Sequence, residues 1–197
     1  MDEMTVFHML DKMKPTAAGT DDLPYWILKL TACSIAKPIA HIYNLSILSS
    51  LQPSQWKQAI ITPIPKIPSP LSEADFRPIS LTPILARNFE KNIIRAYIYP
   101  ILQDSTTSKP FLDQFAFRPT GSTEAALISI LHHVTHLLAI HLYVRLIGLD
   151  FSKAFVTLRH CIILSKLSVL HLPDHVYNWF VNYFKDHSYN QFLWKDI

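Results

Sequence analysis

The sequence predicts an α+β fold that is mostly helical, and three patterns lead to this prediction. Apolar residues recur at helical spacing over 84–97 and over 127–138, which indicates two amphipathic helices. Two short extended stretches, 59–66 and 76–81, flank a loop rich in Pro and Ser and predict a β-hairpin. A nearly continuous apolar run over 142–149 is typical of a strand that is buried on both faces.

Composition is that of an ordinary globular protein. The chain has 197 residues, of which 49% are apolar, so one domain with a real core is possible. Its net charge of +3 permits a nucleic-acid partner but does not argue for one, because a basic binding surface is normally stronger. Cys33 and Cys161 show no metal-binding spacing, and we expect them to be reduced and buried.

The chain is expected to be intracellular, in the nucleus or the cytoplasm. Its first ten residues are acidic rather than basic and show no cleavage-site pattern, so no signal peptide is expected. The longest apolar stretch, 137–151, is interrupted by polar and charged residues, so no membrane-spanning segment and no membrane partner are expected.

Helices are expected on both sides of the hairpin. A short amphipathic helix is predicted within 1–14, and a longer helical region is predicted over 24–50. We expect Pro38 to split the longer one, because proline inside a helix costs about 3 kcal/mol. Another helix is predicted over 82–102, with Glu90 in solvent. Further helices are predicted over 122–139, 159–168 and 173–187.

Two polar or aromatic patterns have more than one interpretation. His132, His133 and His136 could suggest zinc, but no further ligand has a known spacing, and solvated helix histidines are the preferred interpretation. The aromatic residues of 177–184 could stack nucleobases, but their helical spacing favours packing against the sheet.

Asp150 ends the apolar run. A carboxylate at the end of a buried strand is costly unless something pairs with it, and a metal ion is the obvious partner. The alternative is that Asp150 only caps the following turn.

Several motifs together resemble the reverse transcriptases of LINE-type (non-LTR) retrotransposons. The stretch LDFSKAF at 149–155 resembles motif A of that family. WKQAIITPIPK at 56–66, FRPISLTPILARNFEK at 76–91 and DQFAFRPTGST at 113–123 resemble its fingers motifs, in the family's order. LPDHVYNWFVNYF at 172–184 resembles the helix that follows motif A.

The resemblance runs from about residue 19 to about residue 189 and implies a partial right-hand polymerase fold. Fingers helices and the hairpin would occupy about 1–140, and the start of an incomplete palm sheet about 141–197. The whole chain would then be a single incomplete reverse transcriptase domain. Its partners would be an RNA template, a DNA primer and deoxynucleotide triphosphates.

The resemblance also implies site residues and a cofactor. Asp150 would be the catalytic, metal-bridging carboxylate for Mg²⁺, and the backbone carbonyl of Phe151 would be a further metal ligand. Phe155 would lie beneath the incoming sugar, although it could equally be an ordinary core residue. Lys66 and Arg77 would grip the triphosphate, and solvated surface charges are the alternative.

Arg118 would contact template or nucleotide by the same resemblance. The sequence also departs from the family: Val156 stands where LINE-type enzymes usually have Asp, and the loop around Gly19 matches only approximately. No clear motif B is found, and no adjacent pair of aspartates follows Asp150, so motif C is missing.

We therefore expect a truncated RNA-directed DNA polymerase that is inactive alone. A non-catalytic nucleic-acid-binding remnant and a relic without selected function are the alternatives.

Overall fold

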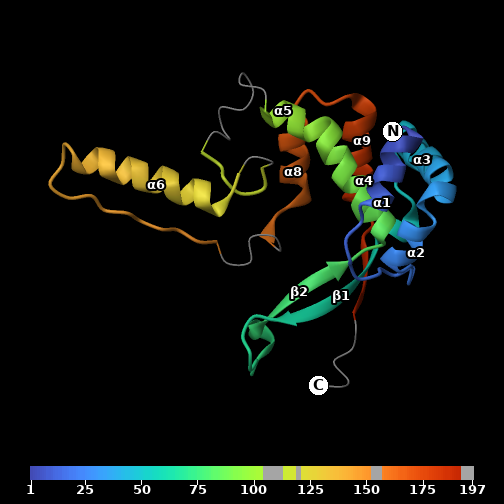
Figure 1. Ribbon diagram of the computed structural model, residues 1–197, viewed down its shortest axis with the longest axis horizontal. Coiled ribbons are helices and arrows are strands. Elements are labelled where there is room, and N and C mark those ends of the chain that lie inside the picture. The colour runs from blue at the N-terminus through green and yellow to red at the C-terminus, as the bar shows by residue number, and fades with distance from the viewer. Residues whose placement is uncertain (104–112, 119–120, 152–156, 192–197) are drawn as a thin grey trace. The chain divides into compact units, whose positions relative to one another are not determined.

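The computed structural model describes residues 1–103, 113–118, 121–151 and 157–191 (Figure 1). It has a mixed α+β composition that is mostly helical, as the sequence predicts. The chain divides into two compact units. The first unit comprises Met1–Asn92 and His160–Ile197, and the second comprises Ile93–Arg159. The predicted division of one domain near residue 140 stays a prediction.

Helices α1 (Glu3–Asp11), α2 (Tyr25–Leu30) and α3 (Ala32–Leu48) begin the first unit, and α1 packs on α3. Asp2 caps α1, since its carboxylate accepts a hydrogen bond from the Thr5 amide at 2.6 Å. The short N-terminal helix predicted from the sequence is thereby confirmed.

The break in the next helical region lies at Thr31 and not at Pro38, so the predicted position of the break is wrong. The Thr31 hydroxyl donates to the Ile27 carbonyl at 2.7 Å, at the junction of α2 and α3. Pro38 lies inside α3 on its exposed side. The carbonyl one turn earlier, on the exposed Ser34, can therefore bond to water, which lowers the cost of the missing amide.

The predicted hairpin is confirmed as β1 (Gln58–Pro65) and β2 (Phe76–Leu81), which pair antiparallel. A third strand, β3 (Ser188–Gln191), pairs parallel to the beginning of β1, so the sheet order is β2-β1-β3. Short 3₁₀ helices precede β1 at Ser54–Lys57 and β2 at Glu73–Asp75.

The hairpin prolines occupy positions where no amide is needed. Lys66 donates its backbone N–H to the Asp75 carbonyl at 2.7 Å, so these two opposite residues form a hydrogen-bonded pair. In an antiparallel ladder, such pairs alternate with pairs that exchange no hydrogen bond. Pro63 lies opposite Pro78, in a pair that exchanges no ladder bond. The described pairing with β3 runs from Gln58 to Ile61, so β1 is central in the sheet at its start.

An aromatic cluster forms the core of the first unit. The Phe89 ring stacks on Tyr43 with centroids 4.3 Å apart, and it meets Trp56 and Trp179 edge-on at 5.6 Å. The Trp179 indole also donates to the Ser46 hydroxyl at 3.0 Å. Trp179 lies on α9 (Asp174–Tyr183), so packing is confirmed for the buried part of this aromatic run, but Trp179 packs on Phe89 and on Ser46 of α3, where the sequence predicted the sheet.

The long helix predicted over 82–102 forms in three consecutive parts: α4 (Ile84–Ile93), a π-helical turn (Ile94–Ile98) and α5 (Tyr99–Gln103). The widened turn directly precedes the segment that contains Pro100. A wider turn accommodates a proline ring that would clash with a carbonyl in a regular α-helix.

Two more helices were predicted correctly. Helix α8 (His160–Leu167) precedes α9 in the first unit. Helix α6 (Thr123–Leu138) lies in the second unit, where the Ser122 hydroxyl accepts the Ala125 amide at 3.1 Å. The α6 histidines are exposed, as expected, but none of the apolar residues on α6 is buried. Both cysteines are exposed, so the prediction that they are buried is wrong.

The strand predicted over 142–149 does not form in this structure. Residues 141–151 carry no strand, and their apolar side chains lie open: Leu142 is fully exposed and Leu149 is 87% exposed. A strand needs a neighbour for its backbone N–H and C=O groups, and no described segment pairs with this one. No helix of the described residues has the length and apolar character needed to cross a membrane.

Candidate nucleotide and metal site

Lys66 and Arg77 lie together on one face of the hairpin. Arg77 pairs with Ile64, and directly opposite residues of an antiparallel pair point to the same face. Lys66 is two residues beyond Ile64, so it returns to that face. Lys66 directly follows β1, and its backbone N–H bonds to the carbonyl of Asp75, so the two cations lie on opposite arms near the tip of the hairpin.

The tip of the hairpin is held by Asp75. Its carboxylate accepts hydrogen bonds from the Leu71 amide at 3.0 Å and from the Ser72 amide at 2.9 Å. These bonds, with the Ser72 hydroxyl and the nearby Lys66 charge, lower the pKa of the Asp75 carboxyl. The loop between the strands is thus ordered by its own side chains.

The two cations differ in their present contacts. The Lys66 ammonium donates to the Ala74 carbonyl at 2.6 Å, so it folds back toward the tip. Arg77 is exposed, and its guanidinium makes no hydrogen bond or ion pair with any residue that the structure describes. A bound anion would complete the coordination of both groups.

Asp150 and Phe151 are both exposed and lie at the end of the unpaired apolar segment of the second unit. The argument that Asp150 needs a partner because it is buried is therefore wrong for this structure, since an exposed carboxylate is hydrated. One carboxylate and one carbonyl are too few for a two-metal site. Among the described residues, no three metal-binding side chains cluster.

Arg118 lies in a turn of the second unit and is half-buried. Its guanidinium is 3.4 Å from the Gln114 carbonyl, and its own carbonyl accepts the Gly121 amide at 3.2 Å. Gly121 is required here, because a Cβ would come within 2.0 Å of the Phe115 carbonyl oxygen. Phe155 lies outside the described residues.

Glu90 was expected in solvent, and this prediction is wrong. It is half-buried on α4, next to Arg87 and within hydrogen-bonding reach of Tyr183 on α9. Burial raises the pKa of Glu90 to about 7, although the Tyr183 hydrogen bond and the Arg87 charge oppose this. The spacing of the residues could have indicated this burial. Glu90 lies four residues after Ala86 and so on the same face of α4, and Ala86 is fully buried.

No protein-family model matches this sequence, and a search of curated proteins finds no match either.

Proposed function

We propose that this chain is the fingers and the first part of the palm of an RNA-directed DNA polymerase of the LINE-type retrotransposon kind. The proposal is supported by the hairpin, whose two arms carry the exposed cations Lys66 and Arg77 close to its tip. The motifs at 56–66, 76–91, 113–123 and 149–155, in that order, add support from the sequence.

The hairpin pair supplies triphosphate binding. An ammonium on a flexible stem and a planar guanidinium are complementary to phosphate oxygens, and the second can bind two of them at once. On binding, Lys66 exchanges its bond to the Ala74 carbonyl for a phosphate oxygen. By the family resemblance, Phe155 would select a deoxynucleotide, and Arg118 would contact the template or the nucleotide.

The metal chemistry belongs to the complete enzyme. There, Asp150, the carbonyl of Phe151 and further carboxylates would hold Mg²⁺, which would supply charge stabilisation at the primer hydroxyl and at the leaving group. The sequence contains no adjacent aspartates after Asp150. These 197 residues therefore lack the carboxylates that DNA synthesis needs, and their proposed role is limited to binding nucleotide or primer-template.

A second candidate is a non-catalytic nucleic-acid-binding function. The specific observation in its favour is that the hairpin cations are both present and exposed, whereas the chain offers a single carboxylate at the metal position. A relic without selected function is the remaining alternative.

The deciding experiment measures binding and synthesis with the same protein. Labelled RNA-template/DNA-primer duplex should bind with an affinity that falls steeply with salt, since phosphate contacts release counterions. Lys66→Ala and Arg77→Ala should each weaken binding, whereas Lys37→Ala, an exposed lysine on α3, should not. A fluorescent deoxynucleotide triphosphate titrated against the same variants separates nucleotide from duplex binding.

The outcomes separate the candidates. Nucleotide binding that depends on both cations supports the polymerase fragment, and duplex binding without nucleotide binding supports the second candidate. Absence of both at low salt leaves only the relic. Mg²⁺-dependent DNA synthesis that is lost in Asp150→Asn would contradict the proposed inactivity.

A further inference from the structure

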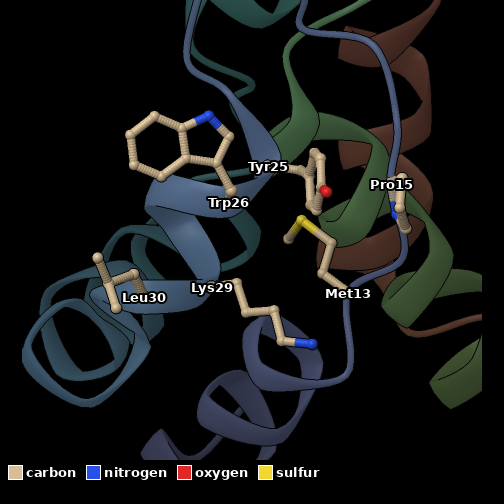
Figure 2. Close-up of a pocket in the computed structure, with 6 residues that line it drawn as sticks. All are labelled: Met13, Pro15, Tyr25, Trp26, Lys29 and Leu30. Carbon is tan, nitrogen blue, oxygen red and sulfur yellow. The ribbon is translucent and has the colours of Figure 1, made fainter.

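The first unit carries an open apolar groove between the end of α1 and the outer side of α2 (Figure 2). Its volume is about 520 Å³, which is room for one or two large side chains. It is lined by Met13, Pro15, Tyr25, Trp26, Lys29 and Leu30.

The groove exposes large apolar side chains that the protein's own core does not use. Trp26 is 55% exposed and Leu30 is 79% exposed, and the two are four residues apart on the same side of α2. Met13 forms a buried part of the lining. Tryptophan, tyrosine and methionine are enriched where proteins bind one another, because they bury much area at a low cost in entropy.

The one charge in the lining of the groove is positive, whereas the charged residues that flank the lining in the sequence are of both signs and include Asp11 and Asp22. Lys29 is the one charged residue of the lining, and Figure 2 shows its side chain extending toward the loop that carries Met13. Lys12 and Lys14 flank Met13 in the sequence, and both are exposed. None of these lysines forms an ion pair within the part of the chain that the structure describes.

We propose that this groove docks an amphipathic helix of a partner protein that carries acidic residues. A large aliphatic side chain of the partner inserts between Trp26, Leu30 and Met13, and a carboxylate one helical turn away pairs with Lys29. The lining is mostly apolar and itself holds one cation, which favours a protein over a nucleic acid as the partner, because phosphates are bound by several cations together. The groove lies apart in sequence from Lys66, Arg77 and Asp150, so this inference stands without the polymerase proposal.

The test uses two synthetic probes and the full chain. One probe is a helical peptide with Leu on one face and Glu on the other, and the second has Lys in place of every Glu. Fluorescence anisotropy of the labelled peptides should show binding of the Glu peptide, with the Lys peptide weaker by about tenfold or more. Trp26→Ala should weaken the Glu peptide by about tenfold through loss of apolar contact.

Charge reversal makes the test specific. Lys29→Glu should lose the Glu peptide and gain the Lys peptide, whereas Lys37→Glu, an exposed lysine on α3, should leave both unchanged. Leu48→Ala is the matched apolar control, because Leu48 is 75% exposed on α3 and does not line the groove. All four side chains are largely exposed, so circular dichroism should show an unchanged fold.

Three results would overturn the proposal. The first is equal binding of the two peptides, or binding that survives Trp26→Ala. The second is that a labelled oligothymidylate binds in their place and requires Trp26. The third is a dimer in sedimentation that Trp26→Ala dissociates, since the groove would then hold a second copy of this chain.

Discussion

The hairpin and the segment 142–151 begin from the same kind of sequence signal and reach opposite structures. Both are short, apolar and extended, and both were predicted to be strands. The arms of the hairpin are close in sequence and pair in register over six residues each. The segment 142–151 finds no partner in the described chain and remains open to solvent. Residue composition sets a tendency to extend, and pairing decides whether a strand exists.

The helices α4 and α6 repeat this contrast. Each carries an apolar stripe at helical spacing, as predicted. On α4, the stripe is buried, and Ala86 and Phe89 have no exposed surface. On α6, no residue is buried, and Leu131 is 55% exposed. A periodic stripe therefore predicts which face of a helix is apolar, but not whether anything covers it.

Truncating one apolar side chain in each helix should separate the two regions most clearly. Phe89→Ala should destabilise the first unit by about 3–5 kcal/mol, because it leaves a cavity amid three other aromatic rings. Leu131→Ala should change stability by less than about 0.5 kcal/mol. Urea unfolding monitored by tryptophan fluorescence measures both. Similar losses in the two variants would mean that α6 is covered in solution.

The carboxylates of Glu90, on the covered helix α4, and of Asp150, in the open segment, allow the covered and open regions to be compared through pH. The folded pKa of Glu90 is about 7, above the usual value of 4.5, so the neutral form favours folding below pH 4.5 and that advantage is lost as pH rises toward 7. Glu90→Gln should therefore stabilise the protein at pH 8 by up to about 3 kcal/mol and have no effect at pH 4.

The matched change in the open segment is Asp150→Asn, which should leave stability unchanged at either pH, because Asp150 is exposed. Thermal unfolding at pH 4 and pH 8 gives the comparison. If Glu90→Gln has equal effects at both pH values, burial does not control this carboxyl.

Two glycines make a third comparison. At Gly19, a Cβ would lie 2.4 Å from the Pro83 nitrogen, and backbone cannot move aside easily. Gly19→Ala should therefore cost about 1–3 kcal/mol. At Gly148, a Cβ meets nothing within 4 Å, so Gly148→Ala should be neutral. Denaturation midpoints of the two variants provide the measurement, and a neutral Gly19→Ala would show that this loop is not packed on Thr82 and Pro83, the residues just before α4.

The smallest effect on stability is expected for Leu149→Lys. Leu149 is 87% exposed, so the change should alter the free energy of unfolding by less than about 0.5 kcal/mol. It should reduce aggregation, because an exposed, unpaired apolar segment promotes association. Light scattering against concentration tests this, with Lys37→Ala as a control. Unchanged scattering would place the aggregation surface elsewhere.

Part of the candidate site could be predicted from the sequence, and part of it could not. The hairpin and its two cations could be predicted, because alternation and proline placement define local register and therefore a shared face. The exposure of Asp150 could not be predicted, since it depends on whether a strand partner distant in the sequence pairs with the segment before it. The burial of Glu90 was not predicted, because a charged residue on a helix is expected to be solvated unless another helix is known to cover it. Here that helix is α9.

The sequence by itself determined most of the helices, the hairpin and the apolar faces, because these follow from interactions among residues close along the chain. Only the tertiary structure decided which faces are covered. It buried Phe89 and Glu90 on α4, placed β3 beside β1 across more than a hundred residues, and left α6 and the segment before Asp150 open. Burial depends on partners distant in the chain, and no local pattern specifies them.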